Sequence, residues 1–215
     1  MTREGGIARQ LILSADQEAL RTAVRELLSD HCRWTSVLAR VESDAPYDNG
    51  LWKRLGDLGV TGLLIPEELG GSGGDARDLA VVCEQLAAFV APVPFLGSAV
   101  LATAALLAVR QEPLAQELLR QLANGEMTAA LAIPATAVPG AALSRTVLAT
   151  DGMLTGTVTP VLDLAPAEVV IVLAWDAGDP ALYVVRPHDE TAAVTPISSL
   201  DLTRPLCSLD LRAVP

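Results

Sequence analysis

The most suggestive chemistry in this chain is a run of small residues, Gly-Gly-Ser-Gly-Gly, at positions 70–74. Consecutive glycines let backbone amides converge on a phosphate, as in nucleotide-binding loops. The run lacks the Gly-Lys-Ser/Thr ending of such a loop, and no clear strand–helix–strand unit surrounds it. The alternative is a sharp structural turn before a helix that Asp75 caps, and we favour this interpretation.

Acidic residues and histidines are too scattered to form a recognisable catalytic or metal site. Glu67 and Glu68 are adjacent in a predicted loop, where side chains diverge into solvent. The 2 histidines, His31 and His188, have no second His or Cys at the spacing of a zinc site. The run at positions 70–74 matches the letters of the Gly-x-Ser-x-Gly motif, but no clear strand–helix–strand unit surrounds it, so we do not expect a nucleophile elbow. We therefore expect no metal and assign no catalytic residue.

The composition indicates an acidic protein with an aliphatic core. The formal net charge is -11, and 51% of residues are hydrophobic but only 3% aromatic. Nucleic acids and anionic membranes bind clustered Lys and Arg, so this charge argues against both partners. The 3 cysteines (Cys32, Cys83, Cys207) are widely spaced and typical of buried reduced thiols. With no secretory signal and no apolar run long enough to span a bilayer, we expect a cytoplasmic protein.

Helical periodicity dominates the first half of the chain. Ser14 and Gln17 can form a capping box for a first helix. Asp48 or Asn49 can start a second helix, which Gly59 ends in a left-handed conformation. Further helices are predicted from Asp75 to about residue 91, at 98–109 and at 113–124.

After Gly125 the periodicity changes to that of strands. Strands are predicted at residues 128–133, 154–158, 169–174, 182–186, 193–197 and 207–211. Helices followed by strands, without alternation, indicate an α+β fold. We expect an N-terminal all-helical domain over residues 1–126, followed by a small antiparallel β-barrel-like domain over residues 127–215.

Several stretches together resemble the acyl-CoA dehydrogenase family. Residues 51–59 read Leu-Trp-Lys-Arg-Leu-Gly-Asp-Leu-Gly, and residues 62–74 read Gly-Leu-Leu-Ile-Pro-Glu-Glu-Leu-Gly-Gly-Ser-Gly-Gly. Asp-Leu-Thr-Arg at 201–204 is similar to many bacterial members, and residues 161–167 to divergent actinobacterial ones. The family has a helical N-terminal domain, a β middle domain and a C-terminal helical bundle. The resemblance implies the first two, and we expect the bundle to be absent because the chain stops at Pro215.

The resemblance also implies FAD, which the β domain holds in part. One family stretch reads roughly Thr-Glu-Pro-x-x-Gly-Ser-Asp. With Gly140 at its glycine, Ala135 replaces the Thr, and Ala141 and Ala142 replace the Ser-Asp pair. A shift of one residue brings Thr136 close to the family's Thr, which makes Thr136 the candidate cofactor-binding residue.

A second family stretch reads roughly Gly-x-Lys-x-Trp-Ile-Thr. With Gly156 at its glycine, Val158 replaces the Lys, Pro160 the Trp and Leu162 the Thr. Aliphatic side chains cannot donate hydrogen bonds to a flavin, and proline cannot stack as an indole does. Backbone amides remain as an alternative source of hydrogen bonds. We expect this chain alone to bind FAD weakly or not at all.

Two functions follow from the resemblance. The first is part of a flavin-dependent oxidoreductase system of fatty acid or steroid metabolism, which oxidises an acyl-CoA to a 2-enoyl-CoA. The chain would be either a truncated form or one whose helical bundle, which usually carries the family's catalytic Glu, comes from a homo- or hetero-oligomeric partner. The second is a non-catalytic partner subunit or binding module that shapes an acyl-CoA or steroid-CoA pocket. A domain with no link to coenzyme A is a third alternative.

Overall fold

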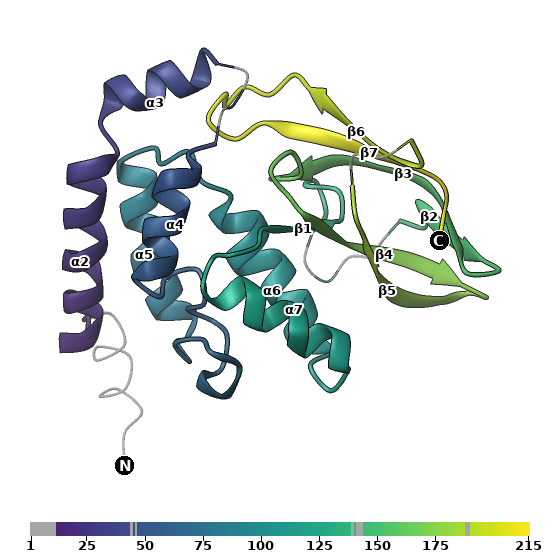
Figure 1. The fold of residues 1–215 in the computed structure, drawn as a ribbon, viewed down its shortest axis with the longest axis horizontal. Helices are drawn as coiled ribbons and strands as arrows, with labels where there is room; N and C mark the ends of the chain where they lie inside the picture. The colour runs from purple at the N-terminus through teal and green to yellow at the C-terminus, as the bar shows by residue number, and fades with distance from the viewer. Residues whose placement is uncertain (1–11, 44, 46, 139, 141–143, 188–189) are drawn as a thin grey trace.

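The computed structural model describes residues 12–43, 45, 47–138, 140, 144–187 and 190–215. Helices precede strands along the chain, as Figure 1 shows, and the predicted α+β class is confirmed. The helical elements are α2 (Ala15–His31), α3 (Trp34–Val41), α4 (Asn49–Asp57), the 3-10 helix η1 (Glu67–Leu69), α5 (Ala76–Ala88), the π-helix η2 (Phe95–Ala102), α6 (Thr103–Ala108) and α7 (Pro113–Ala123).

Three helices begin at capping residues that the sequence predicts. The Ser14 hydroxyl accepts a hydrogen bond from the Gln17 amide at 3.1 Å, and the Gln17 side chain accepts one from the Ser14 amide at 3.1 Å. Asp48 caps α4 and Asp75 caps α5. Each such cap stabilises a helix by about 0.5–2 kcal/mol relative to alanine. The predicted end of the second helix is also confirmed, since Gly59 has a φ of 79°.

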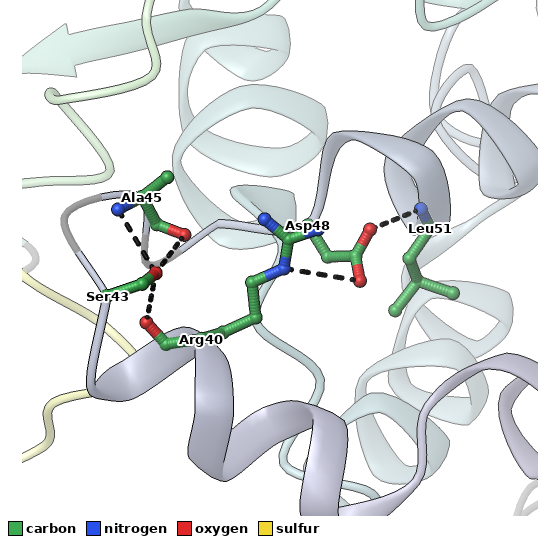
Figure 2. Close-up of polar contacts among 5 residues, drawn as sticks. All are labelled: Arg40, Ser43, Ala45, Asp48 and Leu51. Carbon is green, nitrogen blue, oxygen red and sulfur yellow. Dashed lines mark hydrogen bonds and ion pairs between the residues drawn. The ribbon is translucent and has the colours of Figure 1, made fainter.

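The corner between α3 and α4 depends on short-range polar contacts (Figure 2). The Ser43 hydroxyl donates to the Arg40 carbonyl at 2.8 Å and accepts from the Ala45 amide at 3.2 Å. Asp48 accepts from the Leu51 amide at 2.9 Å through one oxygen, and its other oxygen lies 3.8 Å from the Arg40 Nε atom. These contacts reverse the chain after α3, a helix that the sequence analysis did not predict.

The segment predicted as one helix over residues 98–109 is two elements. The π-helix η2 runs into α6, and the Thr103 amide reaches back to the Ser98 carbonyl, five residues earlier. The Thr103 hydroxyl donates to the same carbonyl at 3.0 Å. The Ser98 hydroxyl accepts from the Ala129 amide at 3.1 Å, so one serine links the wide turn to the first strand.

The strands form a 7-stranded sheet of order β1-β4-β2-β3-β7-β6, with β5 paired to β4. The strands are β1 (Ala129–Ala132), β2 (Val147–Thr150), β3 (Met153–Leu162), β4 (Val169–Asp176), β5 (Asp179–Val185), β6 (Ala192–Ile197) and β7 (Leu206–Val214). Strand β4 pairs in parallel with β1 and with β2, whereas the other pairs are antiparallel. The sheet is therefore mixed, and it is not closed, which refines the prediction of an antiparallel β-barrel-like domain.

Strand β2 is the one strand of this sheet that the sequence analysis missed. It has 4 residues and alternates buried and exposed positions. It pairs with β3 along its length and with the last residues of β4. A strand this short shows too little alternation to be predicted from its own sequence. Its pairing with β3 and β4 is what makes it a strand.

Three groups of buried side chains stabilise the fold. One lies among α2, α4 and α5, and a second fills the inner face of the sheet. The third joins the two halves of the chain, because Leu118 and Leu122 of α7 pack with Ala129, Val169 and Ile171 of the strands. We propose that residues 1–126 and 127–215 are two domains that share this third group of side chains.

The residues 70–74 form a turn whose amides are already used. The amides at positions 70–74 donate to the carbonyls of Glu67, Pro66, Gly62, Ile65 and Leu63, in that order. A phosphate would need these same donors. The geometry therefore supports a sharp turn before α5 and argues against a phosphate-binding loop.

The two-domain division predicts how the separated pieces behave. We expect residues 1–126 to give a helical circular dichroism spectrum and residues 127–215 to give a strand spectrum. Each piece should melt at a lower temperature than the whole chain, since separation exposes the shared side chains. A strong helical signal from residues 127–215 would contradict the division.

Gly71 is predicted to be essential for stability. A Cβ atom at Gly71 would lie 2.0 Å from the Ile65 carbonyl oxygen, so Gly71→Ala must move backbone. We expect a loss of about 1–3 kcal/mol in the free energy of unfolding, measured in urea. Gly50→Ala is the matched control, because a Cβ atom there meets only Asp48 Oδ1 at 3.3 Å and lies in a helix. Equal stability of the two variants would disprove the steric argument.

Candidate functional site

The structure brings together the two stretches that the sequence analysis compared with flavin-binding segments. The first follows β1, and the second lies within β3. They meet where the Ala135 amide donates to the Pro160 carbonyl at 2.6 Å. The predicted alignment therefore brings together two segments that are about 25 residues apart in sequence. This junction is the candidate cofactor site.

The side chains at the junction offer little to a flavin. Ala135 and Thr136 are exposed, whereas Pro160 and Leu162 are partly buried. The Val158 side chain is buried in the core of the sheet, where a bound cofactor would not reach it. Thr136 could donate through its hydroxyl, but the Ala135 amide is already bonded to Pro160. Among the described residues, the donor set does not fit FAD, and the replacements at 141 and 142 lie outside those residues.

A second polar group, which sequence reasoning did not single out, lies between the helices and the sheet. Asp163, at the end of β3, has no exposed surface. The Tyr47 hydroxyl donates to its Oδ1 atom at 3.0 Å, and the Gly97 amide donates to its Oδ2 atom at 2.8 Å. A Cβ atom at Gly97 would lie 2.5 Å from the Asp163 Cβ atom, so only glycine permits this contact.

Burial disfavours the charged form of both members of this pair. Burial raises the pKa of Asp163, while Arg204 and the hydrogen bonds from Gly97 and Tyr47 oppose this rise. Burial, followed by the charge of Asp163, raises the pKa of Tyr47. A carboxyl that is fully buried and bonded on both oxygens cannot reach a substrate. Asp163 is therefore a structural link and not a catalytic base.

The other residues considered from the sequence remain apart. His31 lies in the last turn of α2, and His188 lies outside the described residues. Glu67 and Glu68 are exposed on η1. No group of three or more His, Cys, Asp or Glu residues within the described ranges could hold a metal ion. Of the helices that the structure describes, none has the length and apolarity needed to cross a bilayer.

Comparison with known proteins identifies relatives of both halves of the chain. The family model described as "Acyl-CoA dehydrogenase, N-terminal domain" matches residues 14–126. The protein named acyl-CoA dehydrogenase IpdE2 from Mycobacterium tuberculosis is 40% identical over 142 residues, which cover 65% of this chain and 44% of that protein. The protein of the same name from Mycolicibacterium smegmatis is 37% identical over 142 residues. The aligned region thus spans less than half the length of either curated relative.

Two solved structures resemble nearly the whole chain. A variant of the steroid ACAD Tcur3481-Tcur3483 has a TM-score of 0.79 at 25% identity, with 93% of this chain and 55% of that chain covered. The ChsE4-ChsE5 complex from Mycobacterium tuberculosis also has a TM-score of 0.79 at 25% identity, with 94% and 55% covered. The similarity therefore extends through the sheet.

The Asp163 link predicts an unusual pH dependence of stability. The pKa of Asp163 is raised from its ordinary value of 3.8, so the folded state binds this proton more tightly than the unfolded state. Its contribution to stability is full below pH 3.8 and is lost as pH rises through the folded pKa. Asp163→Asn cannot titrate, but it can accept from Gly97 and donate to Tyr47.

Urea denaturation is repeated from pH 4 to pH 8. We expect the free energy of unfolding of D163N, relative to the wild type, to rise with pH until the folded-state pKa of Asp163 is passed, and then to level off. Asp179→Asn, at the exposed start of β5, controls for the loss of a carboxyl group. A constant difference between D163N and wild type across this range would contradict the link.

Proposed function

The chain belongs to the acyl-CoA dehydrogenase family, since more than half of its residues match that family's N-terminal domain, and from this premise we propose that it is part of a flavin-dependent system that oxidises an acyl-CoA to a 2-enoyl-CoA. The observation that carries the proposal is the match at residues 14–126, joined to a fold similarity that continues through the sheet. A fold alone does not fix a function, so the chemistry must be argued from the site.

The catalytic base of this system is proposed to come from outside residues 1–215. Oxidation of an acyl-CoA begins with removal of a proton beside the thioester carbonyl, which needs an acid–base group within hydrogen-bond reach. Asp163 is the one buried carboxyl in the core of the described residues, and both its oxygens are occupied. In this proposal, residues 1–215 contribute walls of the pocket, and the base comes from a bundle that lies outside them.

A second candidate function is a non-catalytic partner subunit that shapes an acyl-CoA or steroid-CoA pocket. The apolar side chains of Ala135, Pro160 and Leu162 at the cofactor junction favour this function. One similar structure is a complex of two different proteins, and another is described as a steroid ACAD. By analogy, flavin contacts would be supplied mainly by the other subunit.

Exposed apolar side chains support a partner in either case. Trp34 and Leu38 of α3 are 76% and 48% exposed, and Leu202 in the β6–β7 connection is 59% exposed. Contiguous apolar patches on a surface commonly mark contacts with another protein, and Trp34 and Leu38 lie four residues apart on one face of α3. Both candidate functions therefore place this chain in a complex with another subunit. They differ in which of the two subunits binds the flavin.

Flavin titration separates the two candidates. We expect the purified chain to bind FAD weakly or not at all. Two missing hydroxyl bonds and a missing stacked ring amount to about 1.5–4.5 kcal/mol in total. That sum weakens binding by roughly one to three orders of magnitude. Flavin fluorescence during titration with FAD measures the affinity, and acyl-CoA oxidation by the chain alone should be absent.

The double variant Ala135→Thr with Leu162→Thr is the informative comparison, because it restores hydroxyls at two junction positions. It should bind FAD more tightly than the wild type, whereas Thr136→Ala should bind no more tightly. Stoichiometric sub-micromolar binding by the wild-type chain would show that its backbone and Thr136 suffice, and would favour the first candidate over the second.

A further inference from the structure

A cavity of about 330 Å³ lies away from the cofactor junction, between the end of α5, the start of η2 and residues 201–204. In Figure 1, the β6–β7 connection that carries these residues extends from the sheet toward the helices. Leu86, Val90, Phe95 and Leu96 supply apolar walls, and Arg204 supplies a positive charge. This volume is at the small end of the range for ligand sites.

One nitrogen atom of the Arg204 guanidinium has no hydrogen-bond acceptor in the part of the chain that the structure describes. Its Nη1 atom is buried and has no hydrogen-bond partner among the described residues. A buried charged donor without an acceptor is costly, so native proteins rarely leave one unmatched. The charge also acts on its surroundings, since Arg204 opposes the burial that raises the pKa values of Asp163 and Cys83. The guanidinium therefore lies where an external acceptor would be favourable.

The nearby carboxyl groups are engaged elsewhere. Asp201 Oδ1 accepts from the Thr203 amide at 2.9 Å and from the Thr203 hydroxyl at 2.6 Å, within its own turn. Asp163 accepts from Tyr47 and Gly97. Neither carboxylate lies within ion-pair distance of Arg204 in the described structure. A molecule in the cavity could supply the acceptor that the described residues do not give Nη1.

We propose that this cavity binds a monocarboxylate with a short aliphatic chain, with the carboxylate on Arg204 and the chain against Leu86, Val90 and Phe95. A carboxylate matches the planar guanidinium through paired hydrogen bonds. A single negative charge suits the site better than a phosphate dianion, because Asp201 lines the same cavity and the chain carries a net charge of -11. The site requires neither coenzyme A nor flavin and so goes beyond the proposed function.

Calorimetric titration with octanoate tests the proposal on the full chain. We expect one site per chain, weaker binding of butyrate because it contacts less of the apolar wall, and at least about tenfold weaker octanoate binding by Arg204→Gln. Octan-1-ol, which has the chain without the charge, should bind both proteins equally. Arg120→Gln, on the exposed face of α7, is the matched control for loss of one positive charge. Wild-type affinity in R204Q, or an equal loss in R120Q, would overturn the proposal.

Alkylation of Cys83 provides a readout that needs no variant. Cys83 lines the cavity and is partly exposed, whereas Cys32 and Cys207 are buried. We expect octanoate to slow the reaction of Cys83 with iodoacetamide, with a midpoint equal to the calorimetric dissociation constant. Mass spectrometry of the Cys83 peptide measures the rate. An unchanged rate at saturating octanoate would place the ligand elsewhere and refute the site.

Discussion

A single buried carboxyl group, that of Asp163, connects the end of strand β3 to the helical half of the chain. Its two hydrogen bonds come from residues that are 116 and 66 positions away in sequence, Tyr47 and Gly97. Polar groups in an apolar interior have few alternative partners, so such bonds fix the relative position of the segments that carry them. The shared apolar group of α7, β1 and β4 then packs in one arrangement.

Sequence reasoning succeeded where local chemistry decides the structure. Ser14 and Asp75 cap helices because a short polar side chain satisfies amides only two or three residues ahead, and that relation is visible in sequence. Strand β2 and the parallel pairing of β4 were missed for the opposite reason. Four residues carry little pattern, and their place depends on partners that follow much later in the chain.

The candidate site was predictable only in part. The resemblance aligned residues 135 and 160 with two flavin-binding segments, and these residues do contact each other. The engagement of the Ala135 amide could not be foreseen, because it depends on the three-dimensional approach of the segments. The Asp163 link was also missed. Its one signal in sequence is an acidic residue between Leu162 and Leu164 in an otherwise apolar run, which is unusual unless the charge is matched or neutralised.

The π-helix η2 has a consequence for how this chain can vary in length. Each residue advances an α-helix by about 100° around its axis. The extra residue in a π turn therefore sets the direction in which α6 presents Leu106 to the sheet. Substitution within residues 95–102 changes side chains but preserves that direction. Insertion or deletion of one residue rotates every later position of α6 about the helix axis. The number of residues in this segment therefore determines which side chains of α6 pack against the sheet.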